Sequence, residues 1–537
     1  MTPPSRPAVA ARRSEEPRIV FGSAGIGVDD VVALAHGLAV PALSADPQWR
    51  ARIQSGRDVL ARALAEGRTV YGVSTGVGAS VDTDIPSRFQ SDLPHNLFRM
   101  HGCGTGAALD RAETAAVVAA RLASLCRGYS AVRLQVLEHL AALLAAGVLP
   151  RIPEEGSVGA SGDLTPLSYV AALLAGEGEA VVGGALVGAP QALAAAGLEP
   201  LVLEPKESLA LMNGTSVMAG IGALALSRAD RIARAACAVT AMVSAATGGN
   251  REHFDERILG LKPHAGTLAA GGWIRSMFGK GDAEPALRVQ DRYSIRCAPH
   301  VIGVLADAVT LTKSVLDIEI GGVNDNPVVD ADGDCVLHGG NFYGGHVVFA
   351  LDALKGAMAG VADLLDRQLV LLCLPETSGG LPANLVGRSG EAAVAHHGFK
   401  AMQITASALA AEALKTSLPA AVFSRSTESH NQDKVSMGTI AAREARRLAE
   451  LGETVVAIVL LGACQAVDLR LEEGGRIPEP LMRLHEAVRE RVPALAGDRR
   501  QDRDIAEVLE LLRADALPLP PSSYLRAPAA PGHAPSA

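Results

Sequence analysis

The sequence predicts a mainly α fold, in which a smaller N-terminal domain precedes a bundle of long central helices. Two observations support this prediction. From about residue 226 onward, apolar residues recur at three- and four-residue spacing over segments of more than five turns. Before that point, short helical patterns alternate with glycine-rich loops. Helices of such length bury their apolar faces most readily against one another, which favours a bundle.

The N-terminal half is expected to begin with a tail. Residues 1–17 are rich in proline, alanine and charge, a composition that is typical of disorder. Residues 18–225 form the expected N-terminal domain. Its clearest helical patterns cover 111–125 and 135–146.

The C-terminal half is expected to be the long-helix bundle, over residues 226–516. Its predicted helices cover 297–320, 345–373, 391–416, 437–470 and 480–513. Residues 517–537 are rich in proline and alanine, so a second disordered tail is expected there.

Composition and charge exclude several function classes. The net charge of -9 argues against a nucleic-acid surface. The seven cysteines are scattered, odd in number and without a Cys-x-x-Cys pair, which favours reduced thiols in a cytoplasm over disulfides or zinc. No metal site is expected, because the adjacent His396 and His397 cannot share one helix face. The longest apolar runs are too short to cross a bilayer, so no membrane contact is expected.

The segment with the most distinctive chemistry is Ala160-Ser161-Gly162. The Gly162 nitrogen can attack the Ala160 carbonyl carbon and close a five-membered ring, because glycine has no Cβ to block the approach. Loss of water from the ring and of the Ser161 hydroxyl leaves a methylidene-imidazolone (MIO), a carbon electrophile that no ordinary side chain supplies. The tripeptide alone is weak support. The alternative is a plain turn before a helix, with Ser161 or Asp163 as the N-cap.

Several further segments, in a fixed order, resemble one enzyme family. The run GSVGASGDLTPLSY at 156–169 is similar to the MIO segment of the histidine, phenylalanine and tyrosine ammonia-lyases. The others that resemble this family are YGVSTG at 71–76, LMNGT at 211–215, QDRYSIR at 290–296, NDNP at 324–327, HGGNF at 338–342 and HNQDKVSM at 430–437. The resemblance covers roughly residues 20 to 515, and several motifs in one order make chance agreement implausible.

The resemblance implies a fold, a cofactor and an assembly. The fold would be that of the fumarase/aspartase-like lyase superfamily, with the MIO carried by the N-terminal domain. The MIO would form autocatalytically from Ala160, Ser161 and Gly162, with no external cofactor. The substrate would be a small amino acid, and the enzyme a homotetramer whose active sites combine residues from three subunits.

Catalytic roles follow from the same resemblance. Tyr71, on a glycine-rich loop, is the expected base that removes the β-hydrogen, and its ionised form would need local positive potential. Asn213 would donate to the MIO carbonyl oxygen. Tyr293 would assist the MIO and proton transfer. Without the resemblance, Tyr71 is a partly buried loop tyrosine, and Asn213 begins a simple Asn-Gly turn.

The resemblance also assigns residues to substrate binding. Arg296 would bind the α-carboxylate, which its planar fork suits. Asn326 would lie near that carboxylate and Phe342 near the MIO ring. Glu428 and Gln432 match pocket positions. Two alternatives remain open, a surface Arg296 paired with Asp291 or Asp307, and a Glu428 that caps a helix start.

Four positions bear on the ring of the substrate. Met100 and His101 occupy the two selectivity positions, and His101 is similar to the histidine lyases, although some tyrosine lyases share it. Lys400 stands where histidine lyases carry methionine, and Gln432 where they carry the glutamate that suits an imidazole. Tyrosine is therefore favoured, with phenylalanine next. The alternatives are a histidine ammonia-lyase that forms urocanate, and an aminomutase that returns the ammonia to the β-carbon.

Overall fold

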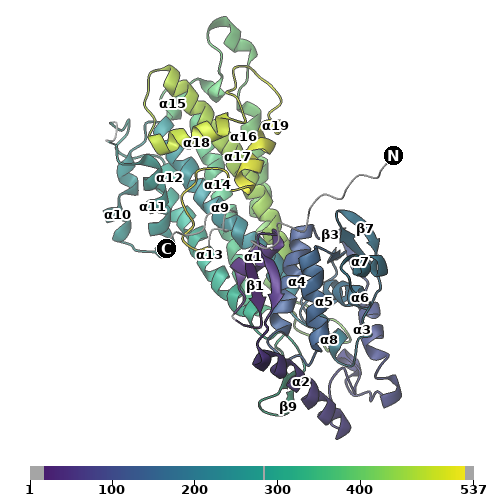
Figure 1. Ribbon diagram of the computed structural model, residues 1–537. Helices are drawn as coiled ribbons and strands as arrows, with labels where there is room; N and C mark the ends of the chain where they lie inside the picture. Colours follow the sequence, from purple (N-terminus) through teal and green to yellow (C-terminus); the bar gives the residue numbers. More distant parts are fainter. Residues whose placement is uncertain (1–16, 24, 282–284, 526–537) are drawn as a thin grey trace, which may run out of the picture.

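The computed structural model describes residues 17–23, 25–281 and 285–525 (Figure 1). Among these residues the helices are α1 (Val28–Ala35), α2 (Pro47–Ala65), α3 (Leu93–His101), α4 (Arg111–Leu125), α5 (Leu134–Ala146), α6 (Leu164–Leu174), α7 (Ala189–Ala195), α8 (Glu207–Met212), α9 (Ser216–Ala246), α10 (Glu256–Gly260), α11 (Ala265–Phe278), α12 (Tyr293–Arg296), α13 (Ala298–Gly321), α14 (Gly345–Cys373), α15 (Pro375–Ser378), α16 (Lys400–Thr416), α17 (Gly438–Glu472), α18 (Glu479–Arg489) and α19 (Asp502–Arg513). The mainly α prediction is confirmed.

Short strands fasten the loops of the N-terminal part. The strands are β1 (Arg18–Phe21), β2 (Val40–Leu43), β3 (Thr105–Ala108), β4 (Leu149–Pro150), β5 (Pro153–Glu155), β6 (Glu179–Val182), β7 (Ala185–Gly188), β8 (Val328–Asp330) and β9 (Cys335–Leu337). β1 and β2 pair in parallel, with Arg18 opposite Val40. The other pairs are antiparallel, in the orders β3-β5, β4-β6-β7 and β8-β9. These sheets are too small to hold a core of their own.

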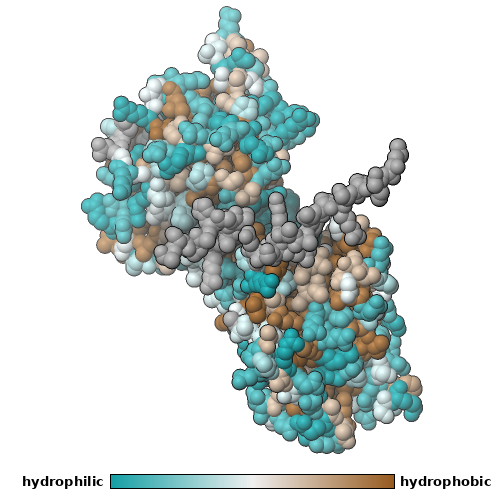
Figure 2. All heavy atoms as spheres, viewed as in Figure 1, coloured by the Kyte–Doolittle hydropathy of each residue, from teal (hydrophilic) through white to brown (hydrophobic). Residues whose placement is uncertain are grey.

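The core lies between the four longest helices, α9, α13, α14 and α17, which pack against one another and connect the two ends of the molecule (Figure 1). α17 is apolar on almost every side between Val455 and Val467, as expected of a helix surrounded by others. In the part of the chain that the structure describes, α17 is the one helix long and apolar enough to span a membrane. However, 78% of its most apolar window is buried inside the fold, as in a core helix. Figure 2 shows a largely hydrophilic face with scattered apolar patches.

The regular helices were predicted well. α4 and α14 have the predicted bounds, and α5, α13 and α17 agree to within two residues. Here the periodic apolar pattern continues without proline or a left-handed residue in the helix interior.

Two predicted helices are wrong in part. The helix predicted over 391–416 begins only at Lys400, because Gly398 has φ +54 and a Cβ there would lie 2.3 Å from the Asn384 carbonyl oxygen. The helix predicted over 480–513 is two helices, α18 and α19. Pro493 lies in the break, where its missing N–H cannot continue a helix.

The expected division of the chain also differs from the structure. The boundary between residues 225 and 226 falls inside α9, a continuous helix of 31 residues. Within the expected tail 517–537, residues 517–525 pack on the helices: Leu517 is buried, and Ser522 donates to the Asp230 carboxylate at 3.0 Å. The remainder of that tail, and all of the expected tail 1–17 except Pro17, lie outside the described residues.

Candidate active site

The Ala160-Ser161-Gly162 segment lies in a turn between β5 and α6, at the end of the molecule that also holds α3 and α8 (Figure 1). The flanking glycines are required by geometry. Gly159 and Gly162 have φ values of +66 and +68. A Cβ on Gly159 would lie 2.2 Å from Ser436 Oγ, and one on Gly162 would lie 2.2 Å from the Gly214 carbonyl oxygen. No larger residue fits at either position.

Two distant segments close around this turn. Ser436 donates to the Gly159 carbonyl oxygen from its amide at 3.2 Å and from its hydroxyl at 3.0 Å. On the other side, Gly162 and Gly214 form an isolated parallel bridge, and the Asp163 amide donates to the Gly214 carbonyl oxygen at 2.7 Å. The turn is therefore held from both sides by backbone and hydroxyl groups.

Asp163 precedes α6, but its side chain anchors the turn to α9. Its buried carboxylate makes no cap bond with α6. Instead it accepts from the amides of Val217 and Met218, in the first turn of α9, at 3.0 and 2.9 Å. It also accepts from the hydroxyls of Ser157 and Thr439. Burial raises the pKa of Asp163 to about 6, and these hydrogen bonds oppose the rise. Asp163 occupies the N-cap position of α6, but the side-chain cap bond of the alternative interpretation does not form.

The residues around the turn fit an MIO. Asn213, which follows α8, is buried, and its side-chain oxygen Oδ1 has no hydrogen-bond partner among the described residues. Its Nδ2 donates to the Asn326 carbonyl oxygen at 2.8 Å and to Asp325 Oδ1 at 3.4 Å. A buried amide with an unused atom next to the Gly162–Gly214 contact is suited to hydrogen bonding with a further polar group. Ala160 and Ser161 are half-buried, so their atoms stay open to a small molecule.

Tyr71 and Glu428 come together on two facing loops. The Tyr71 hydroxyl accepts from the Gly78 amide at 2.8 Å, and the Glu428 carboxylate accepts from the Ala79 amide at 2.9 and 3.0 Å. Gly78 has φ +60, and a Cβ there would lie 2.5 Å from Glu428 Oε2. Burial, with a contribution from the nearby Glu428 charge, raises the pKa of Tyr71, so within one subunit its hydroxyl is protonated at neutral pH. Glu428 itself lies in a turn, so it does not begin a helix in its own segment.

Hydrogen bonds connect this pair to the Asn213 turn. The Tyr71 amide donates to His338 Nε2 at 3.2 Å. The next residue, Gly339, donates to Asn326 Oδ1 at 2.8 Å, and Asn326 in turn accepts from Asn213. Tyr71, Asn326 and Asn213 therefore lie along one connected path within a single chain.

Four further pocket residues lie on nearby loops and a helix end. Gln432 exchanges backbone hydrogen bonds with Thr427, beside Glu428. Phe342 is half-buried in the loop before α14. At the end of α3, Met100 is 57% exposed, whereas His101 is half-buried. His101 Nδ1 lies 3.0 Å from the Leu97 carbonyl oxygen, and burial lowers the pKa of His101, which favours a neutral ring. Its Nε2 has no hydrogen bond with any described residue.

Three predicted site residues lie elsewhere in the subunit. Tyr293 and Arg296 belong to α12, and Lys400 begins α16, at the opposite end of the molecule from α3, α6 and α8 (Figure 1). Tyr293 is 71% exposed, and the Arg296 guanidinium lies 4.5 Å from the centre of its ring. One subunit therefore does not bring these residues to the Ala160–Gly162 turn.

The alternative role for Arg296, pairing with Asp291 or Asp307, does not occur either. Asp291 accepts from the Asn250 amide and Asp307 from the Gly266 amide, each at 2.7 Å. Arg296 Nε is buried, and it has no acceptor among the described residues. Arg296 forms no ion pair among the described residues, and the residue as a whole is only half-buried.

The sequence analysis missed the charged residues beneath the site, which are Arg121, Lys206 and Asp325. All three are buried. Arg121 has one sequence signal, a charge in the middle of the otherwise apolar α4. Lys206 and Asp325 stand among other polar residues and have no such signal. No group of three or more His, Cys, Asp or Glu that could hold a metal ion occurs among the described residues.

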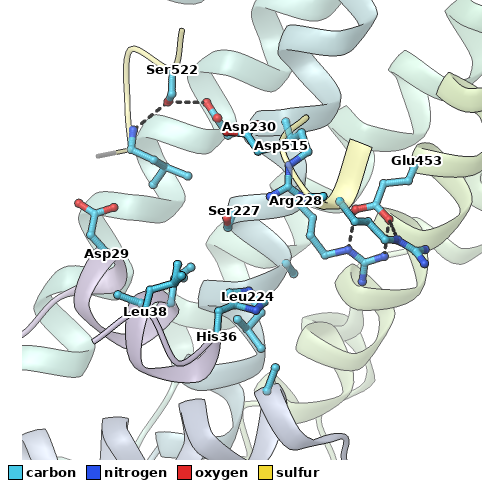
Figure 3. Close-up of a pocket in the computed structure, with 18 of the residues that line it drawn as sticks. Asp29, His36, Leu38, Leu224, Ser227, Arg228, Asp230, Glu453, Asp515 and Ser522 are labelled. Atoms are coloured by element: carbon cyan, nitrogen blue, oxygen red, sulfur yellow. Dashed lines mark hydrogen bonds and ion pairs between the residues drawn. The ribbon is translucent and has the colours of Figure 1, made fainter. Parts of the chain in front are cut away.

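A large cavity lies away from this site. It measures about 1230 Å³ and is bordered by α1, α9, residues 446–453 of α17 and the segment that follows α19 (Figure 3). Arg228 and Glu453 form a bidentate ion pair on its wall, with distances of 2.8 and 2.9 Å. None of the predicted site residues lines it.

Comparisons with known proteins agree with the resemblance. The family model described as "Aromatic amino acid lyase" matches residues 26–490. The histidine ammonia-lyase of Sorangium cellulosum is 40% identical over 469 residues, which cover 86% of this chain and 90% of that protein. The histidine ammonia-lyase of Gloeobacter violaceus is 39% identical over 502 residues, with 92% and 95% covered.

Solved structures extend the likeness to the fold. The histidine ammonia-lyase from Trypanosoma cruzi superimposes with a TM-score of 0.85 at 34% identity, over 93% of this chain and 94% of that one. The tyrosine aminomutase from Streptomyces globisporus gives a TM-score of 0.86, also at 34% identity, over 93% and 97%.

Proposed function

The chain belongs to the aromatic amino acid lyase family and is an ammonia-lyase, and from this premise we propose that it removes ammonia from an aromatic L-amino acid and releases the arylacrylate. The observation that carries the proposal is the turn over residues 159–162. Two left-handed glycines, the Ser436 hydroxyl and the Gly214 backbone hold Ala160-Ser161-Gly162 in a tightly packed, half-open conformation. An ordinary turn before a helix requires none of these contacts.

We propose that Ala160, Ser161 and Gly162 carry an MIO, which would supply a carbon electrophile for the substrate amine. Asn213 would donate to its carbonyl oxygen after its amide turns from Asn326, since its present orientation leaves Oδ1 without a partner. After that turn, a donor in a buried site would stabilise negative charge that develops on this oxygen.

Tyr71 would act as the base at the β-carbon. Its hydroxyl already accepts a hydrogen bond from the Gly78 amide, which favours the ionised form, while burial disfavours it. The positive potential needed to ionise it is not found among the described neighbours of Tyr71 in one subunit. A substrate ammonium group or a neighbouring subunit would have to supply it.

We propose that neighbouring subunits complete the site in a homotetramer. Arg296 has a buried Nε without an acceptor, and Tyr293 is exposed beside it, so both can serve a site on another subunit. There the guanidinium would bind the substrate α-carboxylate.

We also propose a cytoplasmic location, which the odd number of cysteines supports.

Histidine and tyrosine are the two leading candidates for the substrate, and phenylalanine is the third. Histidine is favoured by the names of the curated relatives, which are histidine ammonia-lyases at 36–40% identity. The comparisons therefore support this alternative better than the tyrosine that the sequence analysis favours. Tyrosine is the second candidate, because Lys400 and Gln432 replace the methionine and glutamate of histidine lyases.

One assay separates these candidates. Purified enzyme is incubated with histidine, tyrosine and phenylalanine in turn, with the Ser161→Ala variant as the blank. We expect the ultraviolet band of one arylacrylate and an equal amount of free ammonia. Absence of both with all three substrates would contradict the proposal. A β-amino acid without free ammonia would instead identify an aminomutase.

A double variant tests the ring assignment. If histidine is the substrate, Lys400→Met with Gln432→Glu should raise the activity on histidine or leave it unchanged. If tyrosine is the substrate, the same change should lower kcat/KM for tyrosine and raise it for histidine.

A further inference from the structure

A buried cluster of charges lies beneath the Asn213–Gly214 turn. Lys206 Nζ and Asp325 Oδ2 are 2.6 Å apart, and both side chains are fully buried. Arg121, on α4, is also fully buried. Its Nη2 donates to the Asn324 carbonyl oxygen at 3.0 Å, while its Nε and Nη1 have no acceptor among the described residues. One carboxylate thus faces two cations.

Stability does not account for Arg121. A buried charge costs several kcal/mol unless it is well paired, and apolar residues of similar volume often stabilise a fold as much or more. The Asp325 carboxylate attracts Arg121, but it is already bonded to Lys206, to the Asn326 amide at 2.8 Å and to Asn213. A chain selected only for a stable core would have an apolar residue at position 121.

The position of the guanidinium is more informative. A Cβ on Gly214 would lie 2.0 Å from Arg121 Nη1, so Arg121 packs directly on this glycine. A Cβ on Gly162 would lie 2.2 Å from the Gly214 carbonyl oxygen, so Gly162 packs directly on Gly214 as well. Arg121, Gly214 and Gly162 are therefore in serial contact, and Arg121 limits how far Gly214 can retreat from Gly162.

We propose that Arg121 is a positioning residue that holds the Asn213–Gly214 turn against Gly162, so that the Gly162 nitrogen stays within reach of the Ala160 carbonyl carbon while the MIO forms. This inference rests on the proposed function. Ring closure forms one N–C bond, and the Ala160 oxygen leaves as water with the amide hydrogens of Gly162 and Ser161. The Ser161 hydroxyl leaves with the Ser161 α-hydrogen as a second water, so no oxidant is required.

Mass spectrometry of the purified full-length protein tests the proposal, because the mature chain is lighter than the encoded chain by two waters. For Arg121→Met, we expect the dehydrated fraction, measured at a fixed time after synthesis, to fall about tenfold or more. The circular dichroism spectrum should be unchanged, and the Tm should be equal or higher. Arg121→Lys, which keeps a cation but loses the planar fork, should recover part of the dehydrated fraction.

A second variant covers the case in which Arg121→Met does not fold. Gly214→Ala leaves the charges in place but pushes the guanidinium away, so the dehydrated fraction should fall in the same way. Gly222→Ala is the matched control for Gly214→Ala, because its new Cβ would lie 3.4 Å from Leu351, an ordinary contact distance. Arg228→Met is the matched control for Arg121→Met, because it also replaces an arginine. Both controls should be fully dehydrated.

The outcomes are distinct. Full dehydration in a folded Arg121→Met or in Gly214→Ala overturns the positioning role. A wild-type chain that retains both waters overturns the proposed function itself, and this inference with it. Reduced dehydration in both variants, with normal controls, supports the role of Arg121.

Discussion

The turn at Ala160–Gly162 and the helix end at Arg296 are built in contrasting ways. The turn is held by backbone and hydroxyl groups from its own subunit, and its neighbours are buried. α12 instead presents an exposed Tyr293 and an Arg296 whose Nε has no acceptor among the described residues. The difference is the one that the proposed assembly requires, in which one subunit would build the electrophile and a neighbour would bind the substrate.

The largest effect is expected at the turn. Ser161→Ala removes the β-oxygen that must leave, so activity should fall at least about a thousandfold, which corresponds to about 4 kcal/mol of transition-state stabilisation. Intact mass and steady-state rate are measured together. Ser168→Ala is the matched control, because that hydroxyl donates to Thr165 within the adjacent helix at 2.6 Å. Substantial activity in Ser161→Ala would remove the turn from the mechanism.

The next effect concerns the base. Tyr71→Phe should lower kcat about 10²- to 10⁴-fold while the dehydrated mass stays normal. Because the pKa of Tyr71 is raised and only the ionised hydroxyl accepts a proton, wild-type kcat/KM should rise with pH from about 7 to 9. Tyr169→Phe, which removes a hydroxyl that accepts from the Gly104 amide, is the control. An unchanged rate in Tyr71→Phe would assign the proton transfer to another group.

Subunit mixing tests the contrast directly. Ser161→Ala and Arg296→Met should each be inactive alone. Co-expressed in equal amounts, they should recover about a quarter of the wild-type activity. In a randomly mixed assembly, about a quarter of the sites receive both an intact Ser161 and an intact Arg296. No recovery in a mixed assembly of normal size would mean that turn and arginine act from the same subunit.

The smallest effect concerns stability. Because the pKa of Asp163 is raised to about 6, the folded protein binds more protons than the unfolded chain between about pH 4 and 6, so this residue stabilises the fold as pH falls from 7. Asp163→Asn cannot titrate. The Tm difference, wild type minus variant, should therefore grow from pH 7 to 5, and the corresponding gain in the free energy of unfolding has a limit of about 3 kcal/mol. A constant difference would show that Asp163 is ionised throughout this range.

The long helices could be predicted because their apolar period is local information. α14 has the bounds that its pattern predicts. The boundary predicted after residue 225 was wrong, because it falls inside α9. This helix begins directly after the Asn213–Gly214 turn, and its apolar surface continues on both sides of residue 225. The break at Gly398 was hidden, since it depends on contact with Asn384, which a periodic pattern does not contain.

Motifs nominated the candidate site residues, but they could not predict how those residues are arranged. The contact between Glu428 and Ala79 joins residues 349 positions apart, and no local pattern encodes it. The link from Asp163 to α9 is hidden for the same reason, because a helix-start aspartate normally caps its own helix. Arg121 gave only a weak signal, a charge inside an apolar helix.

The bond between Ser436 and Gly159 has a consequence for when the enzyme becomes reactive. It joins residues 277 positions apart, so the turn reaches its final conformation only after most of the chain has been synthesised and folded. A reactive carbon on a nascent chain would be open to every free amine around the ribosome. Dependence on this late contact would delay the chemistry until a pocket encloses it, and the order of synthesis would then protect both the enzyme and its surroundings.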